Sequence, residues 1–416
     1  MISLNKKNFQ ICIVGLGYVG LPLAARFSLK GFEVTGFDIC EERINQLNNK
    51  VDINNDISDK DLEILLQNTY LTTNVNEIKK NNIYIITVPT PINNDKTPNL
   101  EPLIAASELV GSVMQKDSIV IYESTVYPGV TDEVCTKILN KKSKLIFNKE
   151  FSTGYSPERI VPGDKVNTIE KITKIVSASN EKALKIISFL YSLIIDAGIY
   201  EAASIKVAEA AKVTENIQRD VNIALINEMH QLYTSIGINT NEVIEAAATK
   251  WNFMKLTPGM VGGHCISIDP YYLMHKSNIS GYTPNIMSAA RKINDEMENW
   301  VFKDFLKKMK TKKINLKSIT VTVFGYTFKQ NCSDTRNTKV KNLILLMRDY
   351  GIKVNLWDPL ILDKDHVELN DLGIKTFKKC PKNVEIAFIC VYHDEFIDYF
   401  KNFKGILYDY KNTSRG

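Results

Sequence analysis

Short apolar runs alternate with amphipathic segments along the first half of the chain. The run ICIVG (11–15) is typical of a buried strand, and residues 18–31 carry apolar side chains at helical spacing up to Gly31. Residues 33–38 (EVTGFD) form a second strand pattern that ends in an acid, so the three segments predict a βαβ unit. Further strand-like runs, separated by helical segments, predict a doubly wound parallel sheet; they occupy residues 83–88, 118–124 and 144–148.

A different pattern begins near residue 200. Residues 204–237 are periodic and contain neither Gly nor Pro before Gly237. This pattern predicts one long helix, which is followed by shorter helices up to about residue 310. A helix of this length often forms a central spine or a dimer surface.

The α/β pattern returns from residue 318. A helix pattern ends at Gly351, the following strand pattern ends at Asp358, and a further strand and loop occupy 384–396. This order echoes the N-terminal unit but lacks its glycine fingerprint. We therefore predict an α/β fold with two Rossmann-like doubly wound domains joined by a long central helix, and domains at residues 1–200, 201–310 and 311–416.

Composition narrows the possible partners. The 416 residues include 52 basic and 47 acidic side chains, which give a formal charge of +5. The two signs are too nearly balanced to indicate a protein that binds nucleic acid. The lysine-rich stretch 305–317 is better explained as a solvated helix end and linker. The seven cysteines are irregularly spaced and include no CxxC pair, so we predict neither a metal site nor a disulfide framework.

The N-terminus resembles a secretion signal only superficially. Lys6 and Lys7 precede an apolar run, but that run contains spaced glycines and a proline and leads into another strand pattern. No apolar stretch reaches the roughly 20 residues that a membrane span needs. We expect a cytoplasmic protein with reduced thiols.

A dinucleotide motif follows the first strand. Gly15, Gly17 and Gly20 fit G-x-G-x-x-G between a strand and a helix, a context that favours pyrophosphate binding over a glycine turn without a ligand. Asp38 lies 18 residues after Gly20 and suits the adenosine ribose of NAD, because an acid would repel the 2′-phosphate of NADP. Arg43, about one turn later, could instead serve such a phosphate.

Two threonines follow strand ends, where ligands bind in such sheets. Thr90 belongs to VPTP and Thr125 to ESTVYPG, and both could face the cofactor. Each could equally be a turn-forming residue.

Three polar residues share one face of the predicted long helix. Lys212, Asn216 and Arg219 stand at i, i+4 and i+7. The ammonium and the amide suit a developing oxyanion, and the guanidinium suits a phosphate or sugar oxygen. The alternative interpretation is a solvated polar stripe.

Cys265 is the most interesting of the cysteines. It lies in PGMVGGHCISIDP (258–270), after two glycines that let backbone approach a ligand closely and four residues before Asp269. It could be a nucleophile, a metal ligand or a small residue in a turn. An NAD site favours a nucleophile that forms a thiohemiacetal and then a thioester, with Asp269 activating water, while His264 is a further candidate base. Simple alcohol oxidation with a packing thiol, and a non-catalytic NAD-binding protein, remain alternatives.

These motifs together resemble one family. GLGYVGLPLA, VPTP, ESTVYPG, YSPERIVPGD, KVTENIQR, PGMVGGHCISIDPYYL and GYTFKQNCSDTRNTK occur in the order found in the UDP-glucose/GDP-mannose dehydrogenases, over nearly the full length. The resemblance implies an enzyme that oxidises C6 of a nucleotide sugar to a carboxylate with NAD. It also implies an NAD-binding first domain, a central domain for dimerisation and catalysis, a UDP-sugar-binding third domain, and a homodimer or higher homo-oligomer.

The resemblance assigns roles to individual residues. It implies that Cys265 is the nucleophile, that Asp269 assists hydrolysis, and that Lys212 and Asn216 serve the proton and the oxyanion. Glu158, in SPER, would handle protons or water with Thr125, and Lys329 would bind substrate. Arg336 would reach the cofactor. The remaining motif positions are implied as cofactor contacts (Tyr18, Val19) and substrate contacts (Arg159, Arg219, Gly259, Gly262).

The stretches AATKWNFMKLTPGMVGGHC and SPERIVPGD resemble the branch of the family that acts on UDP-N-acetylhexosamines, and one departure argues against UDP-glucose. The UDP-glucose enzymes carry a second glutamate four positions after Glu158, where this chain has Pro162. The resemblance therefore implies a UDP-N-acetylhexosamine, with UDP-N-acetylglucosamine preferred over UDP-N-acetylgalactosamine, UDP-N-acetylmannosamine and UDP-glucose. Such enzymes feed capsular or O-antigen polysaccharides.

Overall fold

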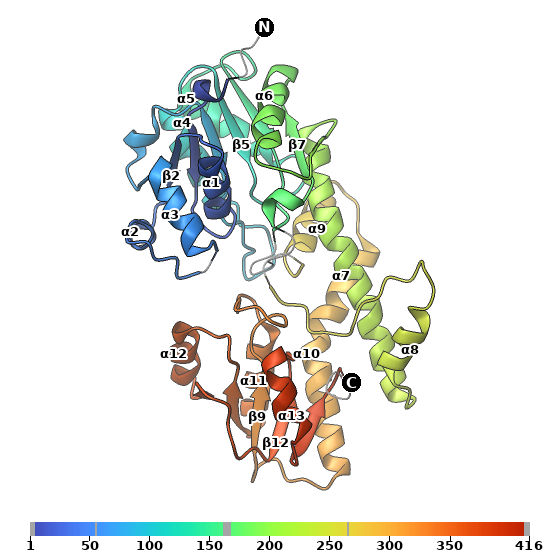
Figure 1. Ribbon diagram of the computed structural model, residues 1–416. Helices are drawn as coiled ribbons and strands as arrows, with labels where there is room; N and C mark the ends of the chain where they lie inside the picture. The colour runs from blue at the N-terminus through green and yellow to red at the C-terminus, as the bar shows by residue number, and fades with distance from the viewer. Residues whose placement is uncertain (1–4, 55, 161–167, 264–265, 412–416) are drawn as a thin grey trace. The chain divides into compact units, whose positions relative to one another are not determined.

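The computed structural model describes residues 5–54, 56–160, 168–263 and 266–411. The chain divides into two compact units, residues 1–215 with 271–282 and residues 216–270 with 283–416. Figure 1 labels most of their helices and some of their strands. The boundary falls within α7 (Ile205–Ser235), the long helix predicted from residues 204–237.

The first unit is built on a sheet with the strand order β3-β2-β1-β4-β5-β6-β7-β8. The pairs run parallel except for β6 and β7, which are antiparallel. The strands are β1 (Ile11–Val14), β2 (Val34–Phe37), β3 (Thr69–Thr72), β4 (Ile83–Ile86), β5 (Ser118–Tyr122), β6 (Phe151–Tyr155), β7 (Lys174–Ala178) and β8 (Ile199–Glu201).

Helices cover both faces of this sheet (Figure 1). Because side chains alternate along a strand, Ile11 and Ile13 of β1 join one core cluster while Cys12 and Val14 join another. The first cluster includes buried side chains of α1 (Gly20–Leu29), α2 (Glu41–Asn48), α3 (Asp59–Asn68) and α6 (Glu181–Ser192). The second includes those of α4 (Glu101–Val113), α5 (Thr136–Ser143) and the start of α7.

The predicted strand at 144–148 is wrong. Helix α5 ends at Ser143, and Lys144 then adopts a left-handed backbone conformation with φ +61°. The chain turns there instead of extending, and β6 begins only at Phe151.

The second unit contains a parallel sheet in the order β11-β10-β9-β12-β13, the same topology as β3-β2-β1-β4-β5. Met297, Val301 and Phe305 of α10 pack on one face, and a cluster of aromatic residues packs on the other. The elements are α8 (Thr240–Ala247), α9 (Asp269–Ile279, shared between the units), α10 (Asn285–Thr311), β9 (Thr320–Phe324), α11 (Lys339–Asp349), β10 (Lys353–Trp357), α12 (Asp363–Asp371), β11 (Lys375–Phe377), β12 (Ile386–Ile389), α13 (Ile397–Lys401) and β13 (Ile406–Asp409).

A local feature repeats between the two sheets. Gly325 follows β9 with φ +85°, as Gly15 follows β1 with φ +96°. The Oδ2 of Asp358 then accepts the Tyr326 N–H at 2.6 Å, in the position that Asp38 holds in the first sheet. The predicted fold class, with two Rossmann-like sheets and a long central helix, is confirmed.

Candidate functional site

The predicted dinucleotide turn joins β1 to α1. A Cβ on Gly20 would lie 1.8 Å from the Gly15 carbonyl oxygen, so any side chain there would push the helix away from the strand. Gly17 has open space around the same position, which leaves its backbone accessible to a ligand. The turn has room for a pyrophosphate at the start of α1, and the roles of the glycines in binding it remain a prediction.

Asp38 directly follows β2. Its Oδ2 accepts the Leu16 N–H at 2.8 Å, and its Oδ1 accepts the Cys40 N–H at 2.9 Å. These two contacts fix the acid beside the glycine turn, where the ribose of a dinucleotide would bind.

Arg43, the alternative partner for a 2′-phosphate, is engaged by protein groups. Its Nε donates to the Leu16 carbonyl at 3.0 Å, and its terminal nitrogens pair with Asp52 at 2.8 Å and Asp56 at 3.2 Å. Two carboxylates already balance the guanidinium, an arrangement that favours NAD over NADP.

The remaining cofactor candidates in this unit lie at its strand ends and glycine turn. Tyr18 and Val19 are half-buried within the turn, Thr90 is buried after β4, and Thr125 is half-buried after β5. Sequence reasoning missed Thr87, whose Oγ1 donates to the Gly15 carbonyl at 2.7 Å. Its place directly after β4 is the signal that could have identified it.

Glu158 belongs to a buried polar cluster, which we name the Glu158 network. Its Oε1 accepts the N–H groups of Arg159 and Ile160, at 2.6 and 2.9 Å, and its Oε2 accepts Lys174 Nζ at 2.5 Å. Sequence reasoning missed the other members of the network, Glu123, Lys174 and Tyr191. Glu123 stands inside ESTVYPG, and that motif was the available signal. Arg159 also pairs with Glu215 at 2.7 Å.

The polar face of α7 differs from the predicted one. Lys212 and Asn216 are buried, so a solvated stripe is excluded for them. Arg219 is exposed, and Asp220 is buried in its place and paired with Arg291 at 2.5 Å. The expected substrate contact of Arg219 remains a prediction.

The second unit brings two predicted site residues together. Asn216 Nδ2 donates to Asp269 Oδ2, and both side chains are buried. Asp269 begins α9, so the hydrogen bond joins the long helix to the segment that follows the cysteine loop.

Cys265 and His264 lie outside the described residues, but their neighbours are placed. A Cβ on Gly262 would come 2.8 Å from the Asn337 carbonyl oxygen, and one on Gly263, with φ +84°, would come 2.9 Å from the Phe328 ring. The glycines thus allow protein groups to pack closely, where we expected a ligand. The Gly263 carbonyl accepts Ser267 Oγ at 2.6 Å and Asn337 Nδ2 at 3.3 Å, which gives Ser267 a physical role in the loop.

The described cysteines differ in their burial. Cys12, Cys135, Cys332 and Cys390 are buried, and burial raises the pKa of Cys135 to about 12. Cys40 and Cys380 are exposed beside turns.

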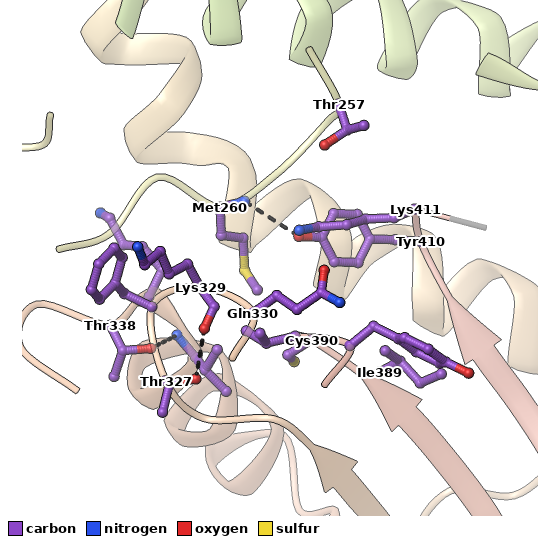
Figure 2. Close-up of a pocket in the computed structure, with 15 residues that line it drawn as sticks. Thr257, Met260, Thr327, Lys329, Gln330, Thr338, Ile389, Cys390, Tyr410 and Lys411 are labelled. Atoms are coloured by element: carbon purple, nitrogen blue, oxygen red, sulfur yellow. Dashed lines mark hydrogen bonds between the residues drawn. The ribbon is translucent and has the colours of Figure 1, made fainter. Parts of the chain in front are cut away.

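A pocket of about 310 Å³ opens beyond the carboxyl ends of β9, β12 and β13. Figure 2 shows Lys329, Gln330, Tyr410 and Lys411 around it, with the Met260 N–H donating to Tyr410 Oη at 3.3 Å. Its lining includes lysines that suit phosphates and rings that suit a base; they are Lys329, Lys339 and Lys411, and Phe328, Tyr392 and Tyr410.

Gly259, a predicted substrate contact, lies next to this pocket. Its N–H donates to Asn227 Oδ1 at 2.8 Å and its carbonyl accepts Asn227 Nδ2 at 2.9 Å. A Cβ on Gly259 would come 3.4 Å from Lys411 Nζ. The structure thus gathers Gly259 near the pocket that Lys329 lines.

Arg336 belongs to the second unit. Its Nε and one terminal nitrogen donate to Asp334, at 2.9 and 2.6 Å. Its reach to the cofactor remains a prediction.

In the part of the chain that the structure describes, the acidic, histidine and cysteine side chains form no group suited to a metal ion. Every helix in that part is too short or too polar to cross a bilayer.

Comparison with known proteins shows the family of the chain. Family models for the UDP-glucose/GDP-mannose dehydrogenases match as an NAD-binding domain (residues 9–195), a central domain (206–296) and a UDP-binding domain (322–414). With the glycine turn and Asp38, these matches define an NAD-dependent dehydrogenase. The chain belongs to the UDP-glucose/GDP-mannose dehydrogenase family.

Its relatives include enzymes and solved structures. The chain is 46% identical to a UDP-N-acetyl-D-glucosamine 6-dehydrogenase of Salmonella typhi, over 97% of this chain and 96% of that protein. It is 45% identical to Protein CapL of Staphylococcus aureus, over 97% and 94%. A UDP-D-ManNAc dehydrogenase structure from Pyrococcus horikoshii superposes with a TM-score of 0.86 at 29% identity, covering 97% and 95%.

Proposed function

We propose that this enzyme oxidises C6 of UDP-N-acetylglucosamine to the uronic acid in two NAD-dependent steps. The observation that carries the proposal is the 46% identity, over almost the whole chain, to a relative named for this substrate and reaction. A Pseudomonas aeruginosa relative with the same name is 47% identical over 88% of the chain.

The residues of the first unit would hold the cofactor. Gly15, Gly17 and Gly20 would admit the pyrophosphate, and Asp38 would accept the ribose hydroxyls. Bound NAD supplies a hydride acceptor. Thr90 and Thr125 lie after neighbouring strands, where they would line the nicotinamide side of the site.

The acid–base work falls to buried polar groups. Lys212 would take the proton of the C6 hydroxyl, and Asn216 would donate to the oxygen that develops negative charge. Glu158 would order a water or accept a proton beside Thr125. Burial of these groups supports the proposal, because polar interactions act more strongly away from bulk water.

Cys265 would carry the second oxidation. Its thiolate would add to the C6 aldehyde, and oxidation of the resulting thiohemiacetal would leave a thioester. Asp269 would activate water to release the carboxylate and regenerate the thiol. The hydrogen bond from Asn216 supports this role, because it fixes the orientation of the Asp269 carboxylate.

The biological setting is also proposed. The similarity to CapL supports synthesis of a surface polysaccharide such as a capsule. The cysteines that the structure describes carry no disulfides, which suits the cytoplasm.

A homodimer is proposed from one face of α7. Leu225 and Leu232 are exposed there, seven positions apart, and the exposed Ile236 follows the end of the helix. Exposed apolar stripes of this kind usually pair with another surface. Sedimentation of the wild-type protein and of Leu232→Glu tests it. A dimer that the substitution dissociates would support the proposal, and a wild-type monomer would contradict it.

An NADH-release screen tests the substrate. The substrates are UDP-N-acetylglucosamine, UDP-N-acetylgalactosamine, UDP-N-acetylmannosamine and UDP-glucose, each compared by kcat/KM. The highest value is expected for UDP-N-acetylglucosamine. UDP-N-acetylmannosamine is the second candidate, because the Pyrococcus horikoshii structure is named for it.

A further inference from the structure

The Glu158 network places one cation between two carboxylates. Lys174 Nζ donates to Glu123 Oε2 at 2.8 Å and to Glu158 Oε2 at 2.5 Å, and the side chains are 4%, 0% and 6% exposed. Tyr191 donates its hydroxyl to Glu123 Oε1, and the ammonium lies 5.4 Å from the centre of its ring. The titratable groups placed against Lys174 include these two glutamates and this tyrosine.

The sheet topology explains why these residues meet. Glu123 follows β5 and Glu158 follows β6, so both stand at the carboxyl edge where the site is expected. Strand β7 runs antiparallel to β6, which brings its first residue, Lys174, to that same edge.

The cluster is not a simple ion pair. Two carboxyl groups share one ammonium in a buried place, where charge that is not fully paired is costly. Burial raises the pKa of Glu123. Burial opposes the charge on Lys174, but the two carboxylates outweigh it and raise the pKa of the ammonium.

We propose that Lys174 is a positioning residue for the oxidation: its ammonium holds Glu158 Oε2 in place, while Glu123 and Tyr191 hold Lys174. The inference rests on the proposed role of Glu158. The two backbone donors fix Glu158 Oε1, so Lys174 supplies the contact that fixes rotation of the rest of the carboxylate. Its charge also offsets the repulsion between the two carboxyl groups.

Two variants separate position from charge. Lys174→Met leaves two facing carboxylates, which would share a proton, so the acid limb of the kcat–pH profile should move upwards. Glu123→Gln/Lys174→Met also removes the repulsion between the two carboxylates, so the acid limb should return to its wild-type position. Glu158 would still lack the contact that holds it in place. Lys142→Met, which breaks the 3.3 Å pair between Lys142 and Glu108, controls for loss of an ion pair elsewhere in the unit.

The assay uses whichever UDP-sugar the wild-type enzyme oxidises in the substrate screen. We expect the plateau kcat of Lys174→Met to fall at least tenfold while KM changes less than threefold. The double variant should restore the acid limb but keep a low plateau, and Lys142→Met should match wild type. Each variant is checked by thermal melting and NAD binding.

The outcomes are distinct. A folded Lys174→Met variant whose plateau kcat and acid limb both match those of wild type would overturn the proposal. A double variant whose plateau kcat returns to the wild-type value would also overturn it, because Lys174 would then only balance charge. If Lys174→Met does not fold, the plateau kcat of the double variant decides the question, because that variant does not bury a second carboxylate. A wild-type enzyme that oxidises UDP-glucose alone would contradict the proposed substrate but leave this test intact.

Discussion

Asn216 donates its side-chain amide hydrogen to Asp269, although the two residues lie 53 positions apart. One comes from the long helix and the other from the start of α9, and both are buried. A carboxylate that must activate water needs a fixed orientation, and this hydrogen bond provides it. The pair is therefore the structural basis of the proposed hydrolytic step.

Removing this amide should slow turnover. A hydrogen bond to a charged group is worth about 1.5–3 kcal/mol, so Asn216→Ala should lower kcat roughly ten- to a hundredfold, with a smaller change in KM. Asn222→Ala is the matched control, because the Asn222 amide donates to the Gln218 carbonyl at an exposed position on the same helix. Steady-state kinetics measure both. A kcat within twofold of wild type for Asn216→Ala would refute the orienting role.

Two glycines of the dinucleotide turn should respond differently to alanine. Gly17→Ala has room for its methyl group, so the melting temperature without NAD should stay unchanged while NAD binding weakens at least tenfold. Gly20→Ala would collide with the Gly15 carbonyl, so it should lose about 1–3 kcal/mol of stability as well. Calorimetry with and without NAD separates them. Equal melting temperatures for the two variants would contradict this reading of the turn.

The pocket of the second unit should bind the UDP portion. Lys329→Met removes one cation from it, so KM for the UDP-sugar should rise roughly ten- to a hundredfold with less effect on kcat. Lys375→Met, an exposed lysine on β11, is the control. Free UDP should inhibit wild type and Lys375→Met equally, but it should inhibit Lys329→Met only weakly. Equal inhibition of all three enzymes would place the nucleotide elsewhere.

Glu209 should make stability depend on pH. Burial raises its pKa to about 7, although its carboxylate accepts the N–H groups of Gly129 and Thr131. The raised pKa means that the folded chain holds a proton that the unfolded chain has released. Its stabilising contribution is therefore complete below pH 4.5 and is lost as the pH rises through 7.

Residue 209 of the variant Glu209→Gln cannot titrate. The free energy of unfolding of the variant, relative to that of wild type, should therefore rise by up to about 3 kcal/mol between pH 4.5 and pH 8. Urea melts at a series of pH values measure this difference. A constant difference would show that Glu209 does not titrate in this range.

Local patterns predicted much of the fold. The spacing of apolar residues indicated β1, α1 and the long helix, because each of these elements carries its own periodicity. The prediction failed at 144–148, where a left-handed Lys144 turns an apolar stretch that resembles a strand. A single left-handed residue does not change the spacing of apolar residues, so that spacing could not predict the turn.

The site was predicted less completely. Motifs identified Asn216 and Asp269, but nothing in their spacing indicated that they touch. Lys174 was missed because a lysine in a strand normally points to solvent, and only the antiparallel β7 brings it between two acids. On α7, spacing alone could not tell which of Arg219 and Asp220 is buried.

The central claim is a four-electron oxidation that passes through Cys265. The most direct test counts NADH released per UDP-N-acetylglucosamine consumed, by wild type and by Cys265→Ser, with the product identified by mass. We predict two NADH and the uronic acid for wild type, and loss of uronic acid formation for the variant. Release of one NADH by wild type, or uronic acid formed by Cys265→Ser at the wild-type rate, would contradict the account.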